Sequence, residues 1–227
     1  MRVTIERPGG TEQLDLPVTR GLLAGYTGRN QDSVRAHVAE LAAHGIAAPE
    51  RVPTVYAVPG TRVRVADAIG VHGSDTSGEG EFVMYRSGGR LLIGAASDHT
   101  DRGLEGYSIV KAKQCSDKPV SGVWWDYADV ADHWDEIRLR AEAYLDNAWQ
   151  PYQHGALADM LMPQDILAEV DRRVPPVDGD VVFSGTLPVI GGEFRPSQRF
   201  RVTLADPVAG REIVCSYHID VLPELDS

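Results

Sequence analysis

Short apolar runs separated by glycine- and proline-rich turns recur along the sequence and limit the folds open to it. Most of these runs have the length of a strand and are too short for a helix. They predict strands over residues 2–5, 13–16, 62–65, 81–85, 91–95, 180–184, 200–204 and 213–221. Pro8-Gly9-Gly10 lies between the first two and predicts a β-hairpin. The proline-punctuated residues 49–59 are expected to form a connection or an edge strand.

Helical periodicity is confined to three stretches, residues 31–45, 131–145 and 163–174. Asp32 or Ser33 is the candidate N-cap of the first. In the second, Ile137, Ala141 and Leu145 recur every four residues, as on one face of a helix. Because strands cluster and helices are few, the sequence predicts an α+β fold rather than a doubly wound sheet.

The charge balance argues against two classes of partner. The chain has 33 acidic and 22 basic residues and a formal net charge of −11. A nucleic-acid binder needs a basic face, and an anionic membrane surface attracts basic segments, so neither partner is expected. The first ten residues contain no apolar run typical of a signal peptide. Cys115 and Cys215 form no spaced framework, which predicts a cytoplasmic protein with free thiols.

Two glutamates ahead of an apolar run form the first candidate site. Glu79 and Glu81 lie two residues apart, and positions i and i+2 of a strand face the same side. Adjacent carboxylates repel unless a cation lies between them, and Asp98, which follows another predicted strand, could supply a third oxygen ligand. Three carboxylates suit a hard ion such as Mg²⁺, Mn²⁺ or Ca²⁺. Taken alone, the Glu-x-Glu pattern favours two solvated acids on an edge strand.

A histidine and a glutamate form the second candidate site. His37 and Glu40 are spaced i, i+3 in the first predicted helix and therefore share a face. A carboxylate beside an imidazole orients the ring and raises its basicity, which makes the pair a candidate general base for water. A solvated surface pair on the same helix face is the alternative interpretation.

In chain order, seven motifs resemble those of the fumarylacetoacetate hydrolase superfamily, and most closely an uncharacterised branch of it. The motifs are Gly28-Arg29-Asn30 with His37 to Glu40, Thr54 to Pro59, Glu79-Gly80-Glu81, Asp98 to Arg102, Lys113 with Pro119 and Trp124, Tyr152-Gln153 to Met160, and Gly179 to Thr186. Together they extend over residues 25–192. The departures include Leu187 inside the usual Gly-Thr-Pro element and Gln114-Cys115 after the lysine. Several of them border the expected substrate site, so an unusual substrate is expected.

The resemblance implies a mixed β-sheet roll with few helices, a small N-terminal α/β subregion over residues 1–52 and a catalytic core over residues 53–227. It also implies a homodimer and a bound divalent ion, Mg²⁺ first, with Mn²⁺ or Ca²⁺ as alternatives. The implied metal ligands are Glu79, Glu81 and Asp98. The implied catalytic residues are His37, Glu40 and Lys113. The implied substrate-binding residues are Arg102, Gln153 and Thr186.

The reaction implied by the resemblance is metal-dependent hydrolysis or lysis of a C–C bond in a small 2-oxo acid or 1,3-dicarbonyl compound, through an enolate. Lys113 would place a cation on the oxyanion, and His37 with Glu40 would activate water or relay a proton. A decarboxylase, a hydratase or dehydratase, and an isomerase on the same scaffold need the same enolate and stay open. A catalytically silent binding protein is a further alternative, against which the intact acidic cluster counts.

Overall fold

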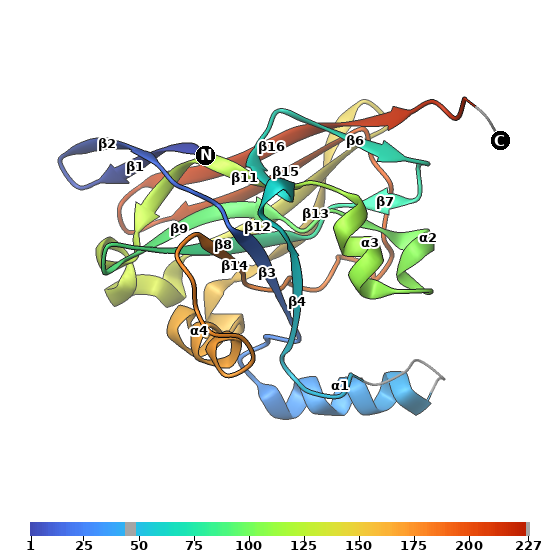
Figure 1. The fold of residues 1–227 in the computed structure, drawn as a ribbon, viewed down its shortest axis with the longest axis horizontal. Helices are drawn as coiled ribbons and strands as arrows, with labels where there is room; N and C mark the ends of the chain where they lie inside the picture. The colour runs from blue at the N-terminus through green and yellow to red at the C-terminus, as the bar shows by residue number, and fades with distance from the viewer. Residues whose placement is uncertain (44–48, 226–227) are drawn as a thin grey trace.

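Strands make up most of the regular structure (Figure 1). The computed structural model describes residues 1–43 and 49–225, apart from the side chains of residue 37 and residues 40–43. The strands are β1 (Arg2–Arg7), β2 (Gly10–Asp15), β3 (Arg20–Gly25), β4 (Thr54–Pro59), β5 (Val63–Val65), β6 (Ala68–His72), β7 (Thr76–Ser77), β8 (Gly80–Ser87), β9 (Arg90–Ser97), β10 (Thr100–Asp101), β11 (Lys118–Asp126), β12 (Arg138–Leu145), β13 (Ala148–Ala156), β14 (Asp180–Phe183), β15 (Arg199–Asp206) and β16 (Arg211–Leu222). The helices are α1 (Gln31–Ala43), α2 (Arg102–Glu105), α3 (Ile109–Cys115) and α4 (Pro163–Asp171), with short 3₁₀ turns η1 (Gly60–Arg62), η2 (Tyr127–Asp129), η3 (Ala131–Glu136) and η4 (Leu157–Asp159).

Two large sheets contain most of the strands. The nine-stranded sheet has the order β2-β1-β11-β9-β8-β14-β3-β4, with β5 also paired to β11. It is mixed, because β1 and β5 pair parallel to β11 and β14 pairs parallel to β3, while the other pairs are antiparallel. The five-stranded sheet has the order β13-β12-β15-β16-β6, and β7 and β10 form a small ribbon. Mixed sheets with few helices confirm the predicted α+β class.

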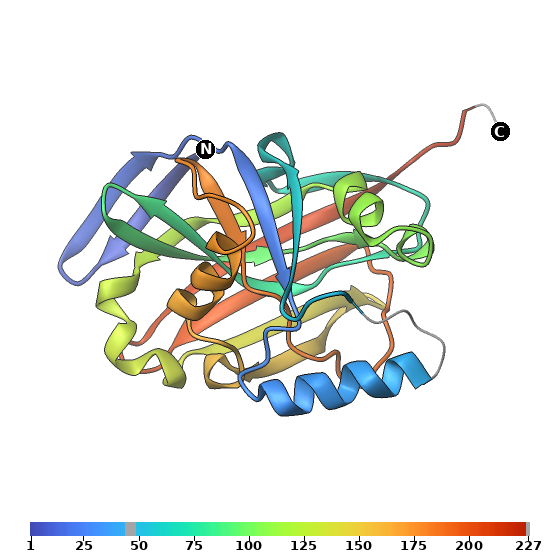
Figure 2. The same ribbon diagram turned by 60° about the horizontal axis from the view of Figure 1, so that its bottom comes forward.

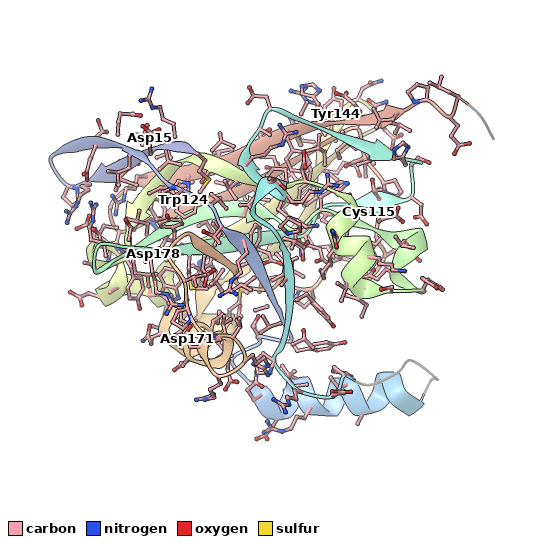
Figure 3. The ribbon with its side chains drawn as sticks, viewed as in Figure 1. Asp15, Cys115, Trp124, Tyr144, Asp171 and Asp178 are labelled. Carbon is pink, nitrogen blue, oxygen red and sulfur yellow. The ribbon has the colours of Figure 1, made fainter. Side chains whose placement is uncertain are left out.

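The nine-stranded sheet is buried on both faces around β8. Phe82 and Met84 pack in the cluster between the two large sheets, whereas Val83 and Tyr85 pack in a second cluster on the opposite face. Side chains alternate between the faces of a strand, so this double burial explains the unbroken apolar run. Trp124, which Figure 3 labels in the interior, belongs to the second cluster and has no exposed surface.

The structure confirms most of the predicted elements. The two N-terminal strands pair as an antiparallel hairpin, β4 lies at an edge of the nine-stranded sheet, and α4 occupies the third predicted helix. The N-cap prediction for the first helix was wrong by two or three residues. The carboxamide oxygen of Asn30 accepts the Ser33 N–H over 3.0 Å, and the helix begins at Gln31.

The predicted helix over residues 131–145 was wrong. A 3₁₀ turn, η3, occupies its beginning and β12 its end. Leu139, Ala141 and Ala143 are buried, while Arg138 and Arg140 at the alternate positions are exposed. The sequence therefore alternates with the period of a strand that has one solvated face.

The helices lie outside the two large sheets. In Figures 1 and 2, α1 lies along the outer edge of the fold, and α2 and α3 lie together near the small β7–β10 ribbon. Within the described part of the chain, none of the helices has the length and apolar character needed to cross a lipid bilayer. Both cysteines are free thiols: Cys115 is exposed at the end of α3 (Figure 3) and Cys215 is buried in β16. The domain division at residue 52 stays a prediction.

Candidate metal centre

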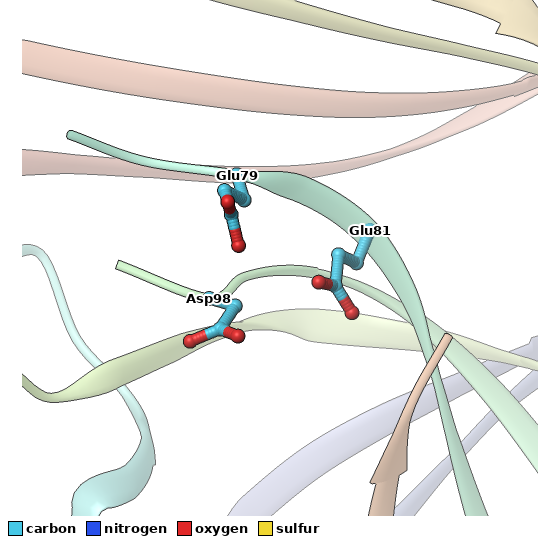
Figure 4. Close-up of side chains that lie close together, drawn as sticks. All are labelled: Glu79, Glu81 and Asp98. Carbon is cyan, nitrogen blue, oxygen red and sulfur yellow. The ribbon is translucent and has the colours of Figure 1, made fainter. Parts of the chain in front are cut away.

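The candidate metal ligands come from the ends of two neighbouring strands. In the antiparallel pair of β8 and β9, Gly80 lies opposite Ser97. The same register, carried one residue further, places Glu79 opposite Asp98, and the Asp98 N–H donates to the Glu79 carbonyl oxygen over 3.0 Å. Glu81 follows on the same side of β8. Figure 4 shows the three carboxylates directed into one space, where one oxygen of each lies within 4.8 Å of the others.

These carboxylates are almost completely removed from solvent. Glu81 and Asp98 are each 1% exposed, and Glu79 is 9% exposed. Burial raises the pKa of the Glu81 carboxyl well above its usual value, and the charges of Asp98 and Glu79 add to this rise. Glu81 accepts the N–H of Gly185 over 2.8 Å, and no cationic side chain pairs with it among the described residues. A buried acid with so little compensation is costly, so the pocket is electrostatically prepared for a cation.

Lys113 extends from α3 into the same cluster. Its Nζ atom lies 2.5 Å from Oδ2 of Asp98 and 3.2 Å from Oε2 of Glu79. The Ser108 side chain caps the start of this helix by accepting the Lys111 N–H. Burial opposes the charge on Lys113, but the two carboxylates outweigh it and raise its pKa above that of an ordinary lysine. The ammonium group is therefore retained within a buried acidic site.

A second lysine, Lys118, reaches Asp98 from the first position of β11. Its Nζ atom lies 2.9 Å from Oδ1 of Asp98 and also donates to the His99 carbonyl oxygen. Burial lowers the pKa of Lys118, and the contact with Asp98 offsets part of that effect. Burial alone would raise the pKa of Asp98, but Lys113 and Lys118 outweigh it and hold that pKa at about 2.

Arg102 borders the cluster on its other side. Its guanidinium contacts Oε1 of Glu79 at 3.1 Å and Glu105 at 2.9 Å, and donates to Oγ of Ser77 over 2.7 Å. The Phe194 ring lies over the guanidinium, with 3.7 Å between the ring centroid and Cζ. This cation–π contact covers Arg102 with an aromatic side chain that is itself half-exposed.

Gln153 and Thr186 hold the backbone between the two glutamates. The carboxamide oxygen of Gln153 accepts the Gly80 N–H over 2.7 Å, and its NH₂ group donates to Oγ1 of Thr186 and to the Leu187 carbonyl oxygen. The Thr186 hydroxyl donates to the Gly80 carbonyl oxygen over 3.0 Å. A Cβ atom at Gly80 would lie 2.8 Å from that of Ala141, so this close packing requires glycine.

The family model described as "Protein of unknown function (DUF2848)" matches residues 24–217, most of the chain. The chain belongs to the DUF2848 family. A comparison with curated proteins finds no match for this DUF2848 protein.

Solved structures confirm that the DUF2848 chain has a fumarylacetoacetate hydrolase-like fold. Cg1458 with an inhibitor is 16% identical, with a TM-score of 0.66 over 93% of this chain and 81% of that one. The apo form of 2-keto-3-deoxy-D-arabinonate dehydratase is 13% identical, with a TM-score of 0.67 over 96% of this chain and 79% of that one. The same dehydratase with magnesium and 2,5-dioxopentanoate is 16% identical, with a TM-score of 0.61 and the same two shares covered. These two proteins therefore share their fold with the DUF2848 chain.

The donor set of the DUF2848 centre fits a divalent ion. Carboxylate oxygens are hard ligands that suit Mg²⁺, Mn²⁺ and Ca²⁺, and three of them converge in the interior. Burial and the neighbouring carboxylates raise the pKa of Glu81 although the charge of Lys113 opposes this rise, so a further cation beside Glu81 would be favourable. The residues present are therefore suited to such an ion.

The structure brings together most of the predicted site residues in this DUF2848 protein. The residues linked by direct contacts or convergence are Glu79, Glu81, Asp98, Arg102, Lys113, Gln153 and Thr186. His37 and Glu40 lie in α1, and their side chains fall outside the described residues. Their predicted role therefore stays a prediction.

Sequence reasoning missed Lys118 and Phe194. The sequence does contain a signal for the lysine: of 22 basic residues, only Lys111, Lys113 and Lys118 are lysines, and all three lie within one short segment. In a chain whose other basic residues are arginines, lysines gathered in one segment indicate that some positions of this segment require a compact ammonium group. No comparable signal marks Phe194, because its contact with Arg102 joins segments that are distant in the sequence.

Proposed function

We propose that this protein is a divalent-metal-dependent enzyme that cleaves a C–C bond in a small 2-oxo acid or 1,3-dicarbonyl compound through an enolate. The observation that carries the proposal is the buried convergence of Glu79, Glu81 and Asp98 with an ammonium group beside them. A bound divalent ion, with Mg²⁺ as our first candidate, would act as a Lewis acid on the oxo group of the substrate.

Lys113 is positioned to stabilise the negative charge that develops on the substrate. Its ammonium has three donors, and two of them are directed at Asp98 and Glu79. A fixed cation in a site that excludes water stabilises a developing oxyanion more strongly than a solvated one does. We therefore assign Lys113 to the oxyanion of the enolate.

Arg102 and Thr186 are the candidates for binding the ends of the substrate. A guanidinium forms paired hydrogen bonds with a carboxylate, and Arg102 is held beside Glu79 by Ser77 and Glu105. The Thr186 hydroxyl lies at the backbone of Gly80. The carboxamide of Gln153 contacts Thr186 and the backbone of Gly80 and Leu187. We propose that Gln153 supports the substrate site by holding Thr186 and the backbone of Gly80 in place.

His37 and Glu40 are the candidates for proton transfer. Their spacing along α1 places them on one face of the helix, as a carboxylate-oriented general base requires. Support for this role comes from the order of the sequence motifs. We propose that the pair activates the water that attacks the substrate carbonyl, or relays a proton to the carbon that leaves.

Dehydration is the second candidate reaction. It is favoured by the similarity in fold to 2-keto-3-deoxy-D-arabinonate dehydratase, one structure of which contains magnesium and 2,5-dioxopentanoate. Loss of water from a 2-oxo acid proceeds through the same type of enolate, so Lys113 would have the same role. Decarboxylation and isomerisation use this intermediate as well. A silent binding protein is a further alternative. Lysine and arginine side chains already pair with Glu79 and Asp98, so the charge that counts against this alternative is that of Glu81, which has no ion pair among the described residues.

Turnover of a substrate panel tests the proposal. Metal-supplemented protein is incubated with acylpyruvates, oxaloacetate and 3-deoxy-2-oxo sugar acids, and the products are identified by mass spectrometry. Hydrolysis gives two carbon fragments with uptake of water, decarboxylation gives CO₂, and dehydration gives one product that is lighter by one water. The double variant Glu79→Ala/Glu81→Ala is the control. If it and the wild type are equally inert and neither binds a divalent ion, the proposed function is wrong.

We further propose a homodimer and a cytoplasmic location. The homodimer is proposed from the family resemblance, and the location is proposed from the two free cysteines. Light scattering on the purified chain measures its mass in solution, and a value near the 24.7 kDa of one chain would contradict the dimer.

A further inference from the structure

Asp98 lies between an acidic and a basic neighbour across three adjacent strands. In the nine-stranded sheet, β9 lies between β8 and β11. On the β11 side, Val120 pairs with Ala96 in an antiparallel register. Carried two residues further, this register brings Lys118 level with Asp98, on the side opposite to Glu79. The alignment of β9 with β11 therefore places Lys118 beside Asp98.

Lys118 holds both the side chain and the backbone of this turn. Its Nζ atom contacts Oδ1 of Asp98 at 2.9 Å and donates to the carbonyl oxygen of His99, the next residue. Lys113 contacts the other carboxylate oxygen, Oδ2, at 2.5 Å. Each oxygen of Asp98 therefore has its own ammonium neighbour, and the two contacts together fix the plane of the carboxylate.

Lys113 and Lys118 differ in their exposure and therefore in their access to a substrate. Lys113 is 9% exposed and contacts two carboxylates of the cluster. Lys118 is 0% exposed and ranks among the largest fully buried side chains of the protein. A group with no exposed surface in this position has no access to a substrate. We therefore expect Lys118 to act on the site through its contacts with Asp98 and with the His99 backbone.

We propose that Lys118 is a positioning residue that fixes the Asp98 carboxylate in the orientation required to bind a divalent ion. The proposal rests on the proposed function, since it assumes that Asp98 is a metal ligand. Groups that hydrogen-bond to a ligating carboxylate set its orientation, and their removal weakens metal binding by about 10- to 100-fold. Loss of Lys118 leaves Oδ1 with only the long contact of the Thr100 hydroxyl at 3.5 Å, which allows the carboxylate to rotate about its contact with Lys113.

Mn²⁺ binding to three lysine variants tests this role. Lys118→Met keeps the length and apolar stem of the side chain and removes its donor. Lys118→Gln keeps an N–H donor and removes the charge. Lys111→Met makes the same change as the first variant at an exposed lysine of α3 and serves as the control. Dissociation constants are measured by calorimetry and by the electron paramagnetic resonance signal of free Mn²⁺, and thermal unfolding without metal reports on the fold.

The expected order of affinities is decisive. Lys118→Met should bind Mn²⁺ about 10- to 100-fold more weakly than the wild type, Lys118→Gln should lie between them, and Lys111→Met should match the wild type. Folded Lys118→Met that binds as tightly as the wild type, or more tightly, overturns the proposal. So does Lys118→Gln that is as weak as Lys118→Met, because the charge rather than the hydrogen bond would then matter.

The outcomes also separate this inference from the proposed function. If the wild type binds no Mn²⁺, the metal-dependent function is wrong and the inference is overturned with it. If the wild type binds and the folded variants bind equally, only the role of Lys118 is wrong. If Lys118→Met does not fold, Lys118→Gln decides: a loss of less than about tenfold supports the role, whereas wild-type affinity or a loss of about 10- to 100-fold overturns it.

Discussion

The backbone N–H of Gly185 donates to Oε2 of Glu81 over 2.8 Å, so the segment after β14 determines where the second candidate metal ligand points. Gly185 has a φ of +82°, a region that residues with a Cβ atom rarely adopt. A Cβ atom there would also collide with Oγ1 of Thr27, whose hydroxyl donates to the Ser184 carbonyl oxygen. Both backbone conformation and packing therefore require glycine at this position.

Gly185→Ala should destabilise the protein and weaken metal binding together. We expect a loss of about 1–3 kcal/mol in the free energy of unfolding from backbone strain, with a further loss from the collision with Thr27. Glu81 should also lose its oriented donor. Urea denaturation and Mn²⁺ titration measure the two effects.

Gly192→Ala is the matched control for this change. Gly192 has a similar φ of +75°, but no atom lies within 4 Å of a Cβ placed on it. This variant should show the cost of strain alone and bind metal as the wild type does. Equal losses of stability and affinity in both variants would contradict the special role of Gly185.

Glu81→Gln should separate stability from metal binding. The carboxylate of Glu81 is buried beside two others, and its raised pKa shows that its charge is unfavourable in the metal-free protein. A neutral amide of nearly the same shape should stabilise the metal-free protein by about 1 kcal/mol, or about 2–4 °C in melting temperature. The same change removes an anionic ligand, so metal affinity should fall at least about tenfold. Thermal unfolding with and without Mg²⁺ measures both effects.

Glu105→Gln is the comparison for Glu81→Gln. Glu105 pairs with Arg102 at 2.9 Å and lies outside the three converging carboxylates. Its substitution should leave metal affinity close to that of the wild type. A metal-free Glu81→Gln protein that melts well below the wild type would show that the Glu81 charge is already compensated.

His37→Ala and Glu40→Ala should affect turnover and leave metal binding unchanged. If the pair acts in proton transfer, kcat should fall by about 10²- to 10⁴-fold, because the ligands of the ion lie elsewhere. Steady-state kinetics on whichever substrate the panel identifies measures kcat, and Mn²⁺ titration measures the metal affinity. His72→Ala, at an exposed position of β6, is the control. Wild-type kcat in both variants would remove the pair from the mechanism.

The ordered motifs of the sequence predicted three carboxylates and a lysine that the structure brings together, and their roles stay predictions. The Glu-x-Glu pattern alone could not distinguish a solvated edge from a metal site, because both interpretations place the two side chains on one face. Its position within the series of family motifs favoured the metal site. The structure supports this choice by burying Glu81 and Asp98.

The error over residues 131–145 has a simple physical origin. Ile137 and Ala141 lie four residues apart, and positions with this spacing share a face in a strand as well as in a helix. The neighbours at i+2, Leu139 and Ala143, are also buried and identify the strand. Alternation over the whole segment was therefore the more informative pattern.

The position of Lys118 could not be predicted from local pattern. Its partner Asp98 is 20 residues away and reaches it only through the register between β9 and β11. That pairing includes a shift in register between Val120 and Trp124, which no local pattern specifies. Contacts of this kind depend on how strands are aligned across a sheet.

The delivery of Glu79, Asp98 and Lys118 by three neighbouring strands has a consequence for refolding. A slip of one residue between β8 and β9 would turn one set of side chains to the opposite face of the sheet and separate the two carboxylates that now face each other. A chain misaligned in this way could keep much of its strand content and its compactness. Binding of one equivalent of metal would thus count the correctly aligned molecules in a refolded preparation, which circular dichroism alone would not distinguish.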